Sequence, residues 1–224
     1  MSGTTCTLVI LLDGIMYYGF VGDSMACMSK VLTATSDQNT LNNDLIVTKP
    51  LHIPGNISEK MRIYSKKGEV RGGNWNQEQM SLRQEEKENQ REGSMAKQDF
   101  TTGLLGNDKA RVYIKARNYP GVGVSRSIGD FTAHRIGLSA EPDVGIKTFT
   151  KNNEYLIIAS RALWNVMTPK EVFSYLQMYR HICLGQLSRQ LANKVRDLYL
   201  LTNDSFPDIT IIIQYLNSQV VKFK

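Results

Sequence analysis

The chain has 224 residues, of which 42% are hydrophobic, and it carries 27 Lys and Arg against 21 Asp and Glu. This length supports one sizeable hydrophobic core, so a single domain is the simplest prediction. The basic residues are scattered and form no run of five or six, which argues against a nucleic-acid-binding surface. No apolar run near the N-terminus is long enough to cross a bilayer, so membrane insertion is not expected.

The cysteine content bears on the compartment. Cys6, Cys27 and Cys183 are odd in number and lack the spacing of a metal site. Free thiols in a reducing environment are the default for such a set. We therefore expect an intracellular protein, either cytoplasmic or within a large cytoplasmic or organellar assembly.

The first predicted element is a β-hairpin. Residues 7–12 and 15–21 are apolar runs of β type, and Asp13-Gly14 separates them. An Asp-Gly pair suits a two-residue turn in which both residues need positive φ. A further strand is predicted over residues 26–32.

A polar loop follows, and then a short helix. Residues 33–48 are rich in Asn and polar residues, which predicts irregular structure. Ser58 is predicted to cap a helix that runs to Ser65, and Gly68 is predicted to end it in a left-handed conformation.

Residues 72–108 differ from the rest in composition. Within 77–91 only Met80 and Leu82 are apolar, so this stretch has no face to bury. We expect a mobile surface insertion in a single domain, and a solvated single helix is the alternative. Trp75 and Met80 are candidate anchors for a protein partner.

Strands and then helices are predicted in the C-terminal half. Strands are expected over residues 111–116 and 155–159, and tight turns over 119–130. Thr168, Pro169 and Glu171 form the pattern of a capped helix start. Apolar residues at helical spacing predict two core-facing helices, and the apolar run 209–216 predicts a last, central strand. The order of elements indicates a layered α+β fold.

Seven short motifs occur in order along the chain. They lie at residues 2–5, 21–24, 59–63 with 68–70, 120–130, 140–144, 159–166 and 207–210. Together they resemble the metal-dependent serine/threonine phosphatases of the PP2C (PPM) family. The resemblance implies an antiparallel β-sandwich flanked by α-helices, with Mg²⁺ or Mn²⁺ held at one end and a bridging hydroxide that attacks phosphorus.

The residues at the family's metal positions depart from its pattern. Arg161 stands where the resemblance implies a carboxylate shared by both metals, and Asn165 and Pro207 replace two further acidic residues. Asp208 lies one residue beyond a ligand position, which on a strand turns its side chain to the opposite face. Asp23 is the one acidic metal position retained, as a weak and vestigial site. Its alternative role is that of a turn residue.

The family's first metal motif and its phosphate-binding arginine would lie before residue 1. The sandwich is therefore expected to lack the family's N-terminal strands and to expose apolar faces and unpaired edges, for example at residues 8–12. We expect a protein partner or a missing segment to complete it.

Three functions are compatible with this pattern. The first is a catalytically inactive scaffold or complex subunit without a metal cofactor, in which Arg161 pairs with Asp23 or Asp208 or points to solvent. The second is an active Mg²⁺- or Mn²⁺-dependent phosphatase completed by another segment, with relocated ligands such as Asp208 and Glu141. The third is a remnant phosphate-binding site; its candidate contacts are Arg161, Arg126 and Arg135.

Overall fold

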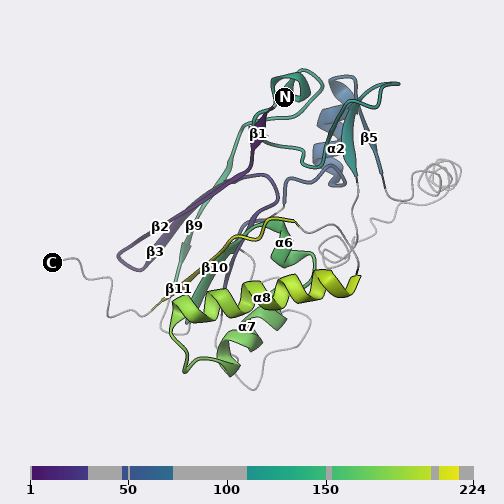
Figure 1. The fold of residues 1–224 in the computed structure, drawn as a ribbon. Helices are drawn as coiled ribbons and strands as arrows, with labels where there is room; N and C mark the ends of the chain where they lie inside the picture. The colour runs from purple at the N-terminus through teal and green to yellow at the C-terminus, as the bar shows by residue number, and fades with distance from the viewer. Residues whose placement is uncertain are drawn as a thin grey trace, which may run out of the picture.

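The computed structural model describes residues 2–29, 47–49, 51–72, 110–149, 153–202 and 207–216 (Figure 1). The predicted insertion at 72–108, with Trp75 and Met80, lies almost wholly outside this part of the chain, as does most of the predicted loop at 33–48. The prediction of a single domain with an insertion therefore stays a prediction.

One sheet is built from the N-terminal hairpin and a strand from the middle of the chain. Its antiparallel order is β2 (Cys6–Leu12), β3 (Ile15–Val21) and β9 (Asp143–Thr148). The turn between β2 and β3 has φ of 48° at Asp13 and 78° at Gly14, which confirms the predicted hairpin.

The second sheet has the order β11 (Ile211–Tyr215), β10 (Tyr155–Ala159), β4 (Met25–Met28), again antiparallel. The prediction of a central last strand is wrong, because β11 lies at an edge of this sheet and β10 is its centre. Burial alternates along β11, so only one face of the strand is packed. On that face, Ile211 and Ile213 pack against the cluster that contains the helices, which accounts for part of the apolar content of residues 209–216. The strand predicted over 26–32 is also shorter than expected and ends at Met28.

The two sheets pack face to face. Met16 and Tyr18 of β3 share a core cluster with Ala26 and Met28 of β4 and with Leu156 of β10. The other face of β10 packs in a second cluster against the helices α6 (Arg161–Trp164), α7 (Pro169–Met178) and α8 (Leu184–Thr202). These helices lie along the side of the β11-β10-β4 sheet away from the hairpin (Figure 1). The predicted α+β sandwich with flanking helices is confirmed.

The helix starts follow local chemistry. Thr168 caps α7 in the predicted capping box with Glu171, and Pro169 occupies the first turn. The short helix α2 (Ile57–Ser65) begins earlier than predicted, because Asn56 rather than Ser58 is its N-cap. The left-handed residue after it is Lys67, with φ of 62°, and Gly68 already belongs to the next strand.

A smaller unit lies beside the sandwich, around α2 (Figure 1). It contains a three-stranded sheet in the order β5 (Gly68–Arg71), β6 (Arg111–Ile114), β7 (Pro120–Val122), and the helix α5 (Phe131–His134). The short strands β1 (Gly3–Thr4) and β8 (Ile128–Gly129) pair with each other. The strand predicted over 111–116 is confirmed and ends at Ile114. No helix in the described ranges is long and apolar enough to cross a membrane.

Candidate functional site

The candidate site is the rim of the sandwich where β10 ends and α6 begins. Ser160 takes an extended conformation as the N-cap of α6, so the chain turns sharply after Ala159. Trp164 Nε1 donates a hydrogen bond to the Ala159 main-chain oxygen at 3.1 Å, which holds the first turn of α6 against the end of the strand. This geometry places Arg161 at the rim, because Arg161 is the first helical residue.

Arg161 forms an ion pair across the rim. Its Nη1 atom lies 3.0 Å from Oδ2 of Asp23, which stands two residues after the end of β3. The Asp23 side chain is 11% exposed and that of Arg161 is 33% exposed, so the pair is largely shielded from solvent. Burial raises the pKa of Asp23, and the Arg161 charge opposes that rise. Of the alternatives for Arg161, the structure shows the ion pair with Asp23.

The other former metal positions surround this pair without adding a buried carboxylate. Asn165 is exposed, and its Oδ1 atom accepts a 3.4 Å hydrogen bond from Arg161 Nε. Asp208 is exposed as well, and its main-chain oxygen accepts a hydrogen bond from Ser160 Oγ. Ser160 Oγ also accepts from Thr210 N, which joins the α6 start to the segment before β11.

A second cluster of charges lies between the smaller unit and the sandwich, and the sequence did not predict it. Glu59 of α2 is buried and receives Arg62 Nη1 at 2.7 Å, Arg126 Nη2 at 2.9 Å and Ser125 Oγ at 2.6 Å. Burial raises the pKa of Glu59, but the hydrogen bonds from these three residues outweigh it and lower the pKa to about 2. The Glu-x-x-Arg spacing on one helix face was the signal available in the sequence.

The cluster continues to β9. Arg126 Nη1 lies 2.9 Å from Asp143 Oδ1, and His52 Nε2 lies 3.1 Å from Asp143 Oδ2. Gly22 N donates to His52 Nδ1, so Nδ1 is an acceptor and the ring proton of a neutral His52 sits on Nε2, facing Asp143. Burial lowers the pKa of His52, which favours this neutral form. Arg126, a candidate phosphate contact, is thus engaged in structural ion pairs, and Arg135 is exposed at the end of α5.

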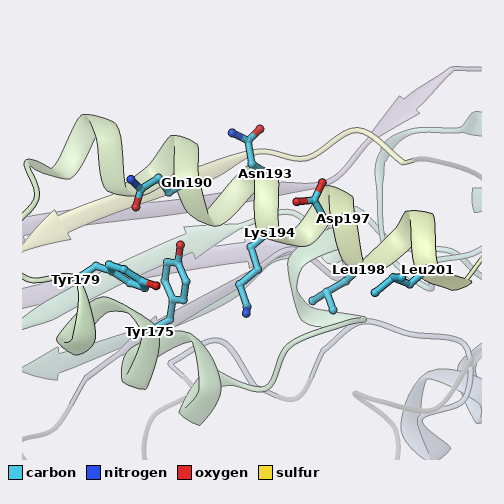
Figure 2. Close-up of a pocket in the computed structure, with 8 residues that line it drawn as sticks. All are labelled: Tyr175, Tyr179, Gln190, Asn193, Lys194, Asp197, Leu198 and Leu201. Carbon is cyan, nitrogen blue, oxygen red and sulfur yellow. The ribbon is translucent and has the colours of Figure 1, made fainter.

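An open groove of about 570 Å³ lies on the helical side, between α7 and α8 (Figure 2). Its wall includes Tyr175, Tyr179, Lys194 and Asp197, and Lys194 Nζ lies 5.5 Å from the centre of the Tyr175 ring. Asp197 is the one acidic residue in its lining, so the groove does not gather the anionic ligands that a hard metal ion needs. The rim at Arg161 therefore remains the candidate functional site.

Comparison with known proteins identifies the family. The family model described as protein phosphatase 2C matches residues 1–200. The chain belongs to the protein phosphatase 2C family. Its fold agrees, because a serine-threonine phosphatase 2C from Toxoplasma gondii superposes with a TM-score of 0.66 over 95% of this chain and 58% of that chain, at 21% identity.

Curated phosphatase 2C relatives match at low identity and over part of their length. Probable protein phosphatase 2C 35 of Arabidopsis thaliana is 31% identical over 111 residues, which is 48% of this chain and 30% of the relative. The integrin-linked kinase-associated serine/threonine phosphatase 2C of Mus musculus is 26% identical over 175 residues, 78% of this chain and 32% of the relative. The matched region thus spans about a third of the length of these relatives.

The described residues do not fit the metal centre that the family implies. Phosphatases 2C depend on Mg²⁺ or Mn²⁺, and such hard ions need several anionic oxygen ligands. Across the described ranges, no group of three or more His, Cys, Asp or Glu side chains is placed to hold a metal ion. Among the described residues of the rim, the one buried carboxylate is that of Asp23, and it already faces the guanidinium of Arg161.

Proposed function

We propose that this phosphatase 2C relative is catalytically inactive and acts as a structural or protein-binding subunit of a larger assembly. The observation that carries the proposal is the ion pair between Arg161 and Asp23, 3.0 Å apart at the rim. The family resemblance implies a shared metal carboxylate where Arg161 stands, so a positive charge replaces a negative one at the centre of the site.

The electrostatics of the rim support this proposal. A divalent cation near Asp23 would be repelled by the guanidinium, and it would have to break an ion pair that is largely shielded from water. Asn165 offers a neutral amide oxygen and Pro207 offers no side-chain ligand. Binding of a divalent metal ion at the rim would therefore require carboxylate ligands from elsewhere.

The proposal is tested by metal binding and by turnover, measured on the same samples. Calorimetric titration with Mn²⁺ should give no site at the rim, and Mn²⁺ should not stimulate hydrolysis of a phosphoserine or phosphothreonine peptide. Arg161→Asp should introduce weak Mn²⁺ binding, because it places a second carboxylate beside Asp23, whereas the neutral control Arg161→Gln should not. Turnover that needs Mn²⁺ and is abolished by Asp23→Ala would refute the proposal.

The alternative is an active Mg²⁺- or Mn²⁺-dependent serine/threonine protein phosphatase, completed by another polypeptide. Two findings support it. The chain belongs to the phosphatase 2C family, and the matched region covers only about a third of the length of the curated relatives. In this case the missing ligands come from outside the 224 residues, and Asp208 or Glu141 serve as relocated ones. Alanine substitution of Asp208 would then reduce turnover in the completed assembly, which the first proposal does not predict.

The exposed sheet face at residues 8–12 supports a further proposal, which concerns what completes the sandwich. We propose that another chain or segment completes the sandwich, and that the protein works inside the cell, as its unpaired cysteines suggest. The proposal includes neither binding to nucleic acid nor insertion into a membrane.

A further inference from the structure

His52 links the charge cluster around Glu59 to the rim at Asp23. Its side chain is only 1% exposed, and it lies between Gly22, which precedes Asp23, and Asp143 of β9. Gly22 N donates a 3.0 Å hydrogen bond to His52 Nδ1, and His52 Nε2 lies 3.1 Å from Asp143 Oδ2. The two ring nitrogens therefore contact two different parts of the molecule.

The His52 ring has little freedom to turn. The Phe20 ring stacks on it, with centroids 4.7 Å apart and an angle of 11° between the ring planes. The main chain of His52 is held as well, because its N–H donates to the Gly22 oxygen at 3.1 Å and its oxygen accepts from Ser125 N at 2.9 Å. A change in the hydrogen bonding of the ring must therefore be taken up by its partners.

Protonation of His52 is incompatible with its present contact to Gly22. In the neutral ring Nε2 carries the proton and Nδ1 accepts, whereas in the imidazolium both nitrogens are donors. The proton on Nδ1 would then face the N–H of Gly22, and this buried amide would lose its acceptor. A buried donor without a partner is unfavourable by about tenfold or more in an equilibrium. The Gly22 amide should therefore move away from the charged ring.

Movement at Gly22 reaches the rim through Asp23. Gly22 has a φ of 108°, a region open to glycine, so its backbone can change conformation. The turn has no room on the side of Thr5, because a Cβ at Gly22 would already lie 2.2 Å from Thr5 Cγ2. Asp23 is the next residue, and its Oδ2 atom lies 3.0 Å from Arg161 Nη1. A displaced turn therefore alters the distance on which this ion pair depends.

Charged groups from three segments face His52. Asp143 of β9 contacts the ring, Arg126 Nη1 lies 2.9 Å from Asp143 Oδ1, and Glu59 of α2 pairs with Arg126. The contacts from residues 20–22 carry no charge. Burial is the largest effect and lowers the pKa of His52 from 6.5; Asp143 and Glu59 oppose this, and Arg126 adds to it. The ring is thus neutral at neutral pH and takes up a proton on acidification.

We infer that protonation of His52 loosens the ion pair between Arg161 and Asp23, so that acidification opens the rim. His52 is the positioning residue in this coupling, because it acts on Asp23 through the Gly22 amide. The proton comes from solvent, and it exchanges one accepted hydrogen bond of the ring for one donated. The inference does not depend on whether the rim has lost catalysis.

The test is an NMR titration of the isotope-labelled 224-residue chain between about pH 8 and about pH 5, the range in which histidine changes charge. The His52 ring nitrogens, the Gly22 amide and the Arg161 guanidinium should shift with one common midpoint, below pH 6.5. Hydrogen exchange at the Gly22 amide, corrected for its intrinsic dependence on pH, should become at least about tenfold faster once His52 is protonated.

His52→Asn is the matched variant, because asparagine Oδ1 can accept from the Gly22 N–H in place of Nδ1 but does not titrate. The Gly22 and Arg161 resonances should then show no transition in the same range. His181→Asn, which removes an exposed histidine between α7 and α8, should leave the transition of the parent chain unchanged.

Three results would overturn the inference. The first is a parent chain in which the Gly22 and Arg161 resonances stay fixed while His52 titrates, or in which His52 stays neutral throughout the range. The second is a transition that persists in His52→Asn, and the third is one that disappears in His181→Asn. The parent titration remains decisive if His52→Asn does not fold.

Discussion

Replacing Glu59 by glutamine tests the role of the buried charge cluster in acid stability. The Glu59 side chain is only 4% exposed, and it neutralises Arg62 and Arg126 between α2 and the sandwich. Glutamine keeps the size of the side chain and one acceptor oxygen, but it removes the negative charge. At neutral pH the variant should be less stable than the parent by about 3–5 kcal/mol, the usual cost of breaking a buried ion pair.

The pH dependence follows from the pKa of Glu59. That pKa is lowered from 4.5 to about 2 in the folded chain, and one pKa unit corresponds to about 1.4 kcal/mol, so ionised Glu59 contributes about 3 kcal/mol. Because the folded pKa is the lower one, this contribution is complete above about 4.5 and is lost as the pH falls towards about 2. His52, whose pKa burial lowers, also costs stability as the pH falls below 6.5. Because the charge of Glu59 opposes that lowering, this cost is larger in Glu59→Gln than in the parent.

The assay is urea unfolding, followed by tryptophan fluorescence and far-ultraviolet circular dichroism, between neutral pH and about pH 2.5. The difference in free energy of unfolding between parent and Glu59→Gln should shrink by about 3 kcal/mol over the acidic part of this range. Glu141→Gln, which removes an exposed carboxylate near Arg126, should change stability by less than about 0.5 kcal/mol. If the parent and Glu59→Gln curves run parallel from neutral to acidic pH, the cluster does not stabilise the fold through the charge of Glu59.

Three further substitutions probe the rim, the smaller unit and the helical layer. Arg161→Ala leaves the buried carboxylate of Asp23 without its cation. The pKa of Asp23 should therefore rise further, and the free energy of unfolding should fall by about 1–3 kcal/mol. A shift of the Asp23 carboxyl titration to lower pH, followed by NMR, would contradict this. Gly68→Ala would place its Cβ 2.2 Å from the Ile136 main-chain oxygen, and we expect a loss of about 2 kcal/mol or more in urea unfolding, with an unchanged midpoint as the contrary result. Thr168→Ala removes the capping box of α7, which should cost about 1 kcal/mol in thermal unfolding, while Thr168→Ser should retain most of that stability.

Local patterns predicted the elements whose cause is local. Asp13-Gly14 produced its hairpin because few residue pairs accept two positive φ angles, and Thr168 to Glu171 started α7 because both capping partners lie within four residues. The predicted start of α2 was two residues too late. Asn56 and Ser58 are both residue types that suit an N-cap, and the path of the preceding chain places the extended backbone of the N-cap at Asn56.

The last strand shows where such reasoning fails. An apolar run cannot distinguish a strand buried on both sides from one that packs a single face under helices. β11 is of the second kind, because β10 occupies the centre of the sheet. The order of strands in a sheet depends on contacts between segments far apart in sequence. The hydrophobic periodicity of a single strand therefore cannot predict it.

By itself the sequence determined the family and the chemical identity of the rim, because motifs and substitutions such as Arg161 are properties of single positions. Only the tertiary structure decided which charges meet. It brought Arg161 to Asp23, 138 positions away in the sequence, and Arg126 to Glu59 and Asp143, and it left the outer face of the first sheet uncovered by the described helices. Ion pairs and exposed faces arise from packing between distant segments, so their physical origin lies in the fold as a whole.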